Sequence, residues 1–397
     1  MFEFKNYSFD QNTGIALFSY QGPTGIIFTE KVRFTVPENA NYDNFMLDSA
    51  LFFAWIVLGT SYYKAAPTPE VILPKELDES QVNFFNQIYQ EGLGQFAYEN
   101  HLMRENLAHF VANKNVPDPA PSTLPETGPT LVLLSGGKDS ILTAKLLEEK
   151  GHKIRPIYIS ASTVYPEIIR NFGEPIIIER IIDRENLTRA AGKNGHVPVT
   201  LINEAISVIQ AILLGSSEIQ LGIGREGLEP HAQIGDLLVN HQWSKTDVAQ
   251  NLLKNYIKTH IATNLNIGSI LENYTELEIA KLFAEHCWAD YGHTFSSCNV
   301  ANYKQDQLGG KLKWCGKCPK CANSYLLFAP FVPFVEQKQI FGGRDLFKDP
   351  ELTETFKGLL GVDGVMKPFE CVASVTELRW AYKNRLPGYG KLPFEID

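Results

Sequence analysis

The sequence predicts an α/β protein in which a parallel-sheet domain follows a smaller α+β domain. Three observations lead to this prediction. Short apolar runs alternate with helical patterns after residue 130, alternating strand patterns occupy the first part of the chain, and a Pro- and Gly-containing stretch separates the two. At 397 residues the chain also exceeds the size at which one hydrophobic core usually stops growing. We therefore expect two domains.

Residues 1–115 are predicted to form the α+β domain. Alternating apolar and polar residues indicate strands of an antiparallel sheet, and helical spacing follows them. The strands are expected at 14–20 and 25–36, and the helices at 46–58 and 81–93. Apolar periodicity is then lost among Pro, Ser, Thr and Gly, so residues 116–129 are expected to be a linker.

Residues 130–397 are predicted to form the catalytic domain. Its strands are expected at 131–134, 154–159 and 218–223, and its helices at 140–149, 204–214, 245–261 and 276–287. Strands that alternate with helices imply a parallel sheet with helices on both faces. No internal repeat accompanies this pattern.

Charge and hydropathy restrict the partners. The formal net charge of -9 disfavours a broad phosphate-neutralising surface, so a small or mid-sized anionic substrate is favoured over nucleic acid. The N-terminal residues lack the pattern of a secretion signal. The longest apolar stretch, Leu51–Gly59, is far shorter than the roughly 20 residues of a membrane span. We expect a cytoplasmic protein without a membrane segment.

The hexapeptide Ser135–Ser140 (SGGKDS) lies between a predicted strand and a predicted helix. Gly136 and Gly137 allow backbone amides to approach an anion, and the helix N-terminus adds partial positive charge. The loop is therefore predicted to hold a pyrophosphate group. A glycine-rich turn without a ligand is the alternative.

The side chains of this loop fit the same function. Lys138 offers a mobile positive charge, and Asp139 offers a carboxylate for magnesium, so we assign catalytic roles to both. Ser135 and Ser140 add hydroxyl groups. Because Asp139 follows the lysine, the spacing differs from that of a Walker loop.

The hexapeptide instead resembles the SGG-x-DS signature of the PP-loop ATP pyrophosphatases. The resemblance implies an adenine nucleotide alpha hydrolase-like sheet and binding of ATP at residues 135–140. It also implies the reaction type. The loop grips the β,γ-pyrophosphate while a substrate oxygen attacks the α-phosphate, which gives an adenylate and pyrophosphate.

A second glycine motif, Gly222–Gly227, matches the dinucleotide-binding spacing, but Leu228-Glu-Pro-His prevents the helix that this function needs. The motif still follows a predicted strand, where α/β sheets bind ligands. Arg225 and Glu226 are therefore candidate substrate-binding residues.

Four of the six cysteines lie close together in the sequence. They are Cys298, Cys315, Cys318 and Cys321. Four thiolates on short loops are the ligand set of a closed, structural zinc site, so a four-cysteine zinc insertion in the catalytic domain is predicted. An iron–sulfur cluster and redox or free thiols stay open as alternatives.

The PP-loop and the cysteine motif together also describe the queuosine-precursor synthases. Five other segments resemble the UDP-N-acetyl-α-D-muramoyl-L-alanyl-L-glutamate epimerases. They are GTSYYKAA (59–66), EGLGQFAY (91–98), GHVPVT (195–200), NHQWSK (240–245) and KPFECV (367–372). The resemblance covers both predicted domains.

This resemblance implies an ATP- and magnesium-dependent inversion of the terminal L-glutamate of a peptidoglycan precursor, with AMP and pyrophosphate as products. Adenylation removes the charge of the carboxylate and acidifies the α-proton, which a base and an acid on opposite faces can then exchange. Lys64, Arg225 and Lys245 are candidates for binding the substrate's phosphates or carboxylates.

Cys371 and His196 are the candidate proton-transfer residues, and Tyr63 is a further alternative. A small buried cysteine and a core histidine are the structural alternatives. Two other functions remain open. A base-modifying synthase would need no additional N-terminal domain or would carry a basic surface, and a nucleotide-sensing module would bind ATP without turnover.

Overall fold

The computed structural model describes residues 1–396 except 39, 114–115, 117–119, 226–229 and 303–308. The strands of its main sheet are β1 (Phe2–Asp10), β2 (Ile15–Gln21), β3 (Ile27–Arg33), β4 (Val71–Ile72), β5 (Thr130–Leu133), β6 (Ile154–Ser160), β7 (Ile176–Ile181), β8 (Glu218–Gln220) and β11 (Asn266–Gly268). Within the described residues they form one nine-stranded sheet in the order β11-β8-β5-β6-β7-β3-β2-β1-β4. A separate hairpin pairs β9 (Ala232–Ile234) with β10 (Leu237–Val239).

The sheet is mixed. Strands β11, β8, β5, β6 and β7 are parallel neighbours, which agrees with the predicted parallel sheet. The predicted strands β2 and β3 form the antiparallel part together with β1, which was not predicted. The two parts join where β3 runs antiparallel to β7, with Val32 opposite Arg180. The α/β prediction is therefore confirmed, and the N-terminal strands extend the same sheet. The division into domains 1–115 and 130–397 stays a prediction.

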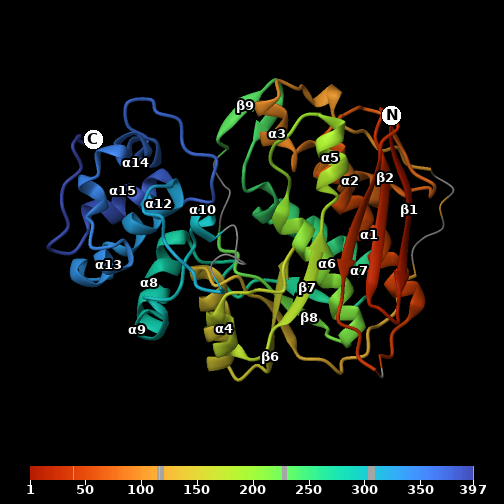
Figure 1. Ribbon diagram of the computed structural model, residues 1–397, viewed down its shortest axis with the longest axis horizontal. Helices are drawn as coiled ribbons and strands as arrows, with labels where there is room; N and C mark the ends of the chain where they lie inside the picture. The colour runs from red at the N-terminus through yellow and green to blue at the C-terminus, as the bar shows by residue number, and fades with distance from the viewer. Residues whose placement is uncertain (39, 114–115, 117–119, 226–229, 303–308, 397) are drawn as a thin grey trace.

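The helices surround this sheet, and the C-terminal ones form a lobe at the left of Figure 1. They are α1 (Asn44–Tyr63), α2 (Glu79–Gln90), α3 (Gly94–Glu99), α4 (Lys138–Glu149), α5 (Arg184–Ala190), α6 (Val199–Leu214), α7 (Asp247–His260), α8 (Glu276–His286), α9 (Trp288–Tyr291), α10 (Asn299–Asn302), α12 (Pro319–Phe328), α13 (Phe334–Ile340), α14 (Thr353–Leu360) and α15 (Val375–Lys383). Short 3-10 turns are η1 (Arg104–Asn106), η2 (Glu167–Phe172), η3 (Trp243–Lys245), η4 (Leu346–Lys348) and η5 (Pro350–Leu352).

Short polar residues determine where several helices begin. Asp43, Asp78, Thr246 and Thr275 each accept a backbone N–H from the first turn of α1, α2, α7 and α8. Asp78 and Gln81 form a reciprocal capping box.

The sheet separates two hydrophobic cores. Adjacent residues of a strand face opposite sides, and Leu131 and Val132 of β5 accordingly belong to different cores. The core of Leu131 contains α1 and α6, which pack together, and the core of Val132 contains α4, α8 and the C-terminal helices. Helices therefore cover both faces, as the sequence predicted.

Helix α1 is apolar on all sides because it lies between the sheet and other helices. It packs against β1, β2, α2 and α6. By length and composition it is the one described helix that would be able to cross a membrane, but 83% of its most apolar window is buried inside the protein. This burial is typical of a core helix.

Candidate functional site

A cavity of about 440 Å³ lies at the carboxyl edge of the parallel strands. The residues that follow β5, the last residues of β6 and the residues that follow β8 form its floor, which is where open α/β sheets bind ligands. Its size is within the range of small-molecule sites. The lining residues include Leu134, Ser135, Gly137, Asp139, Ser140, Tyr158, Thr200, Asn203, Leu221, Gly222, Lys245, Ser296, Ser297, Asn302 and Lys320.

The loop Ser135–Ser140 forms one wall of this cavity. Gly136 has a φ of +83°, which permits the sharp turn from β5 into α4. The hydroxyl of Ser140 accepts the N–H of Ser135 at 3.3 Å and donates to the carbonyl of Gly137 at 3.1 Å. The N-cap residue of α4 is Gly137, which has no side chain to accept the backbone N–H groups of the first turn. The helix therefore begins at the cavity with backbone amides suited to an anion.

Lys138 lies beneath this wall and is not among the cavity-lining residues. Its side chain is 3% exposed, and its ammonium donates to Asp139 and, at 2.7 Å, to Glu276 of α8. Burial alone would lower the pKa of Lys138, but the two carboxylates offset that effect and raise it. Asp139 does line the cavity. The buried lysine thus connects the loop to α8.

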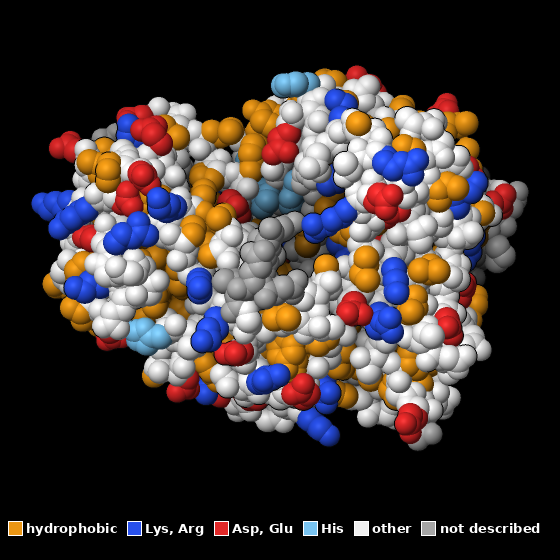
Figure 2. Space-filling view, viewed as in Figure 1, with side chains coloured by type: hydrophobic (Ala, Val, Ile, Leu, Met, Phe, Trp, Pro, Cys, Tyr) orange, Lys and Arg blue, Asp and Glu red, His pale blue; other side chains and the backbone are white. Residues whose placement is uncertain are grey.

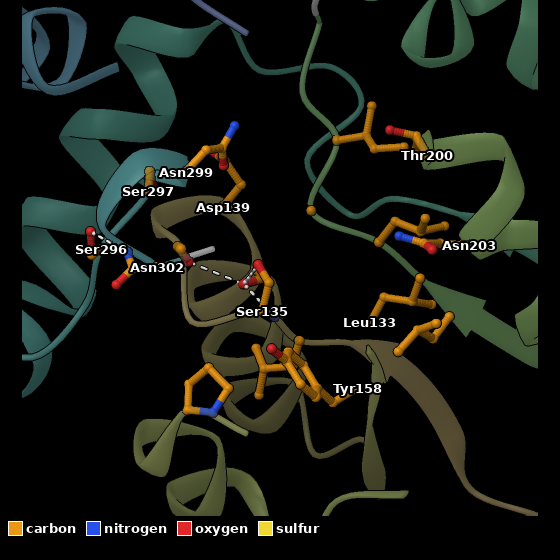
Figure 3. Close-up of a pocket in the computed structure, with 18 of the residues that line it drawn as sticks. Leu133, Ser135, Asp139, Tyr158, Thr200, Asn203, Ser296, Ser297, Asn299 and Asn302 are labelled. Atoms are coloured by element: carbon orange, nitrogen blue, oxygen red, sulfur yellow. Dashed lines mark hydrogen bonds between the residues drawn. The ribbon is translucent and has the colours of Figure 1, made fainter. Parts of the chain in front are cut away.

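Polar side chains from two other segments face the loop across the cavity, and the sequence analysis did not single them out as site residues. Thr200 and Asn203 lie on the side opposite Ser296 and Asn302, with Ser135 between them (Figure 3). The hydroxyl of Ser297 accepts the backbone N–H of Lys138 at 3.2 Å. In the sequence, only the position of Ser296 two residues before Cys298 would have indicated that this segment contributes to a site.

The structure gives a steric reason for glycine at position 222, the first residue of the second glycine motif. A Cβ at this position would lie 2.6 Å from the backbone N of Ser140 and 2.7 Å from the backbone C of Asp139. The glycine therefore allows the end of β8 to approach the first turn of α4.

We predict that Gly222→Ala displaces this turn, lowers the free energy of unfolding by about 1–3 kcal/mol and impairs ligand binding in the cavity. Urea denaturation and nucleotide binding measure the two effects. Gly94→Ala is the control, because its Cβ would meet no described atom closer than 3.6 Å. Equal effects of the two substitutions would contradict the prediction.

A second, polar pocket of about 400 Å³ adjoins the first, and Ile223 and Lys245 line both. Arg225, which is exposed, and Lys254 add positive charge to it. Lys254 pairs with Glu272 at 3.1 Å. Two of the predicted substrate-binding residues therefore share one pocket beside the cavity, whereas Glu226 lies outside the described residues.

Glu204 of α6 lies behind these pockets and is fully buried. One oxygen accepts the side-chain amide of Gln250 at 2.8 Å, and the other has no hydrogen-bond partner among the described residues. Burial raises the pKa of Glu204 to about 8. The folded protein therefore holds this carboxyl group protonated at neutral pH.

This raised pKa predicts a pH dependence of stability. Between the ordinary pKa and about 8 the unfolded chain loses this proton while the folded chain keeps it, so the contribution of Glu204 to stability falls as pH rises. We expect Glu204→Gln to be more stable than the parent protein at pH 8.5, with a smaller difference at pH 5. Denaturant titrations at both values test this. A pH-independent difference would be incompatible with the raised pKa.

Histidine side chains gather in a hollow between the C-terminal helices and the rest of the molecule (Figure 2). The rings of His196 and His241 have centroids 4.4 Å apart, and His231 lies 6.2 Å from His241. All three are half-buried. Burial, assisted by the charge of Lys64, lowers the pKa of His196 to about 4.

The segment that contains Cys371 packs against these histidines. Phe369 stacks on His231 with centroids 5.3 Å apart, and the carbonyl of Val372 accepts the side-chain amide of Gln242 at 3.5 Å. Cys371 itself is half-buried. Tyr63, the further alternative, is fully buried in the core, and its hydroxyl donates to the carbonyl of Thr68.

The five segments that carried the resemblance meet around this hollow. Lys64 donates to Asn194 at 2.7 Å and to the carbonyl of Gly195 at 3.2 Å, which joins the first and third segments. Tyr98 packs against Phe369, which joins the second and fifth, and His241 of the fourth contacts His196. The third and fourth segments continue into the cavity wall at Thr200 and Lys245.

The four predicted cysteines are brought together as a group. Their sulfur atoms all lie within 4.8 Å of one another, and the Sγ–Sγ distances from Cys318 to Cys298 and to Cys321 are 3.6 and 3.5 Å. Zn–S bonds of ~2.3 Å in a tetrahedron place sulfurs roughly 3.8 Å apart. The arrangement is therefore suited to a metal ion, and it lies next to the cavity, since Cys298 also lines it.

Comparison with known proteins agrees with this arrangement. The model of the MurL N-terminal domain matches residues 1–270, and the model of the MurL C-terminal domain matches residues 294–386. The chain belongs to the MurL family. The cavity is lined by residues from both matched regions.

Three similar MurL-family proteins are named UDP-N-acetyl-alpha-D-muramoyl-L-alanyl-L-glutamate epimerase. The protein from Salinispora tropica is 35% identical over 95% of this chain and 82% of its own length. Those from a Micromonospora species and from Xanthomonas oryzae pv. oryzae are 34% and 32% identical, over 95% and 96% of this chain and 84% of their own lengths. Each match thus extends over nearly the whole of this chain.

Proposed function

We propose that this protein is an ATP-dependent epimerase of peptidoglycan precursor synthesis. It adenylates the terminal L-glutamate of UDP-MurNAc-L-Ala-L-Glu, inverts the α-carbon and releases the D-glutamyl product with AMP and pyrophosphate. The observation that carries this proposal is the meeting of the five family segments beside the cavity that the loop Ser135–Ser140 lines. Membership of the MurL family supports the choice of substrate.

ATP binds in the cavity in this proposal. The backbone amides at the start of α4 and the hydroxyls of Ser135 and Ser140 bind the β,γ-pyrophosphate. The apolar surface of Ile157 and Ile159 suits the adenine base. Asp139 is the protein ligand for magnesium, which neutralises phosphate charge. Lys138 acts from beneath by holding Asp139 in position.

The acceptor substrate occupies the second, polar pocket and the hollow that contains the histidines. Arg225 and Lys245 bind its anionic groups, and Lys64 contributes charge beside His196. Lys245 lines both pockets, so a glutamyl carboxylate bound there lies beside the nucleotide. This arrangement positions the carboxylate oxygen for attack at the α-phosphate.

The inversion then follows in balanced steps. The carboxylate forms a bond to the α-phosphorus as pyrophosphate leaves. A base removes the α-proton, a proton is returned to the opposite face, and water cleaves the acyl adenylate to release AMP. His196 contacts His241 and the segment that contains Cys371 packs on His231, so both candidate proton-transfer groups belong to segments beside the hollow.

The four-cysteine cluster holds a structural zinc ion in this proposal. Cys298, Cys315, Cys318 and Cys321 would supply all four ligands, and the ion would pin the cavity-lining segment that precedes it. We further propose a cytoplasmic protein whose partner is the nucleotide-linked peptide rather than nucleic acid or a membrane, in agreement with its net charge of -9.

The test is pyrophosphate release from MgATP with UDP-MurNAc-L-Ala-L-Glu in deuterated water, followed by chiral and mass analysis of the glutamate. Pyrophosphate together with deuterated D-glutamate supports the proposal. Pyrophosphate release with only a deazapurine or another carboxylate would refute the substrate, and nucleotide binding without any turnover would favour a sensing module.

A further inference from the structure

Gln95 of α3 connects a surface carboxylate to the histidines of the hollow. Its side-chain nitrogen donates to Glu99 at 2.6 Å, and its side-chain oxygen lies 2.6 Å from Nδ1 of His241. A carboxylate only accepts hydrogen bonds, so the amide group of Gln95 must face Glu99. Its carbonyl oxygen therefore faces His241, and His241 must donate from Nδ1.

This chain of hydrogen bonds selects one tautomer. A neutral imidazole that carries its proton on Nδ1 has its lone pair on Nε2. Gln95 is only 8% exposed, and α3 packs against β10, which directly precedes the His241 loop. The donor and the acceptor are thus fixed on packed elements, and Nε2 is the ring nitrogen left for a substrate.

The position of His241 is suited to chemistry next to the nucleotide. In the sequence His241 lies four residues before Lys245, which lines the cavity. Its ring contacts that of His196, and four residues after His196 the chain reaches Thr200, which also lines the cavity. Burial and the neighbouring His196, His231, Lys245 and Lys320 lower the pKa of His241 to about 3, so the ring is neutral at neutral pH. Negative charge on a bound substrate raises that pKa again.

We propose that Nε2 of His241 exchanges the α-proton of the glutamyl residue on one face, and that Gln95 and Glu99 are positioning residues that fix its tautomer. This inference rests on the proposed function and assigns one of its two proton transfers to His241 in place of the neighbouring His196. The Cα–H bond breaks, its electron pair moves into the acyl adenylate as an enolate, and the proton moves to Nε2. A group on the opposite face returns a proton to Cα, and His241 releases its own to solvent.

The first experiment separates the two half-reactions in His241→Gln. Wild-type protein that forms no pyrophosphate would refute the proposed function itself. If the wild type is active, we expect the variant to form pyrophosphate while deuterium incorporation at Cα falls by about 100-fold or more. Deuterium incorporation at the wild-type rate would overturn the inference.

The second experiment tests the tautomer and does not depend on the folding of His241→Gln. In Glu99→Gln the new side-chain amide can accept a hydrogen bond as well as donate one. The side-chain amide of Gln95 can then rotate so that its nitrogen faces His241, and exchange of the α-proton should slow by at least about tenfold. The double variant Gln95→Glu/Glu99→Gln restores an acceptor toward Nδ1 and should recover exchange. Its carboxylate raises the pKa of His241, so the acidic limb of the pH–rate profile should move to higher pH.

Glu105→Gln, on the exposed turn η1, is the control for the loss of one negative charge nearby. The inference requires that this control leave exchange unchanged. If Glu99→Gln also leaves exchange unchanged, or if the double variant is no better than Glu99→Gln, then the hydrogen-bond chain does not select the tautomer and the positioning role is refuted.

Discussion

Replacing Lys138 with methionine is expected to lower the free energy of unfolding by about 3–5 kcal/mol and to abolish pyrophosphate release. The Lys138 side chain is 3% exposed and its ammonium is the shared partner of Asp139 and Glu276, so its removal leaves two carboxylates close together with little water. The remaining charge also displaces Asp139 from its position in the cavity wall. Denaturant titration and a pyrophosphate assay measure the two effects.

Lys145→Met is the matched control for this substitution. Lys145 is on the same helix, and its contact with Asp290 is 3.8 Å long with the aspartate side chain 60% exposed. An exposed pair of this kind contributes less than about 1 kcal/mol. If Lys138→Met costs no more than the control, the buried lysine is not the connection between the loop and α8.

Replacing Cys321 with serine is expected to remove the metal ion that we propose for the four cysteines and to lower the free energy of unfolding by more than about 4 kcal/mol. Cys321 is fully buried, and its sulfur lies 3.5 Å from that of Cys318 and 3.7 Å from that of Cys315. Without the ion these groups lose the interaction that holds them together. Metal analysis and thermal unfolding measure the result, and a strong chelator should reproduce it.

Cys287→Ala is the control, because Cys287 is a buried cysteine outside the cluster. It should retain one equivalent of zinc and tolerate the chelator as the parent protein does. Wild-type protein purified without metal but with full stability would exclude a structural metal, and iron with sulfide in place of zinc would favour the iron–sulfur alternative.

Part of the secondary structure of the catalytic segment was predictable from local pattern, whereas the helices after α8 were not predicted. The strand at β6 and the helices α7 and α8 lie within two residues of their predicted ends, because their periodicity and capping residues are contiguous in the sequence. Six of the described strands were not predicted, namely β1, β4, β7, β9, β10 and β11. In β1 the alternation is weakened at the exposed end after Phe4, and the apolar run of β7 is short.

The functional residues divide in the same way. The loop Ser135–Ser140 and the cysteine motif are each nearly contiguous, so spacing alone marked them as candidate sites, and the structure brings the four cysteines together. Glu276 was not identified, because its role arises only where the start of α8 contacts α4. Gln95 and His241 lie in segments that the resemblance had marked, but the hydrogen bond between them spans 146 residues.

The sequence by itself determined the α/β class and marked the loop Ser135–Ser140 and the four clustered cysteines as candidate sites, because each depends on residues that are close in the chain. Tertiary structure alone decided that the N-terminal strands extend the parallel sheet, that Lys138 is buried in an ion pair, and that five distant segments surround one hollow. The physical reason is that burial and hydrogen bonding depend on distances in space, which spacing along the chain does not specify.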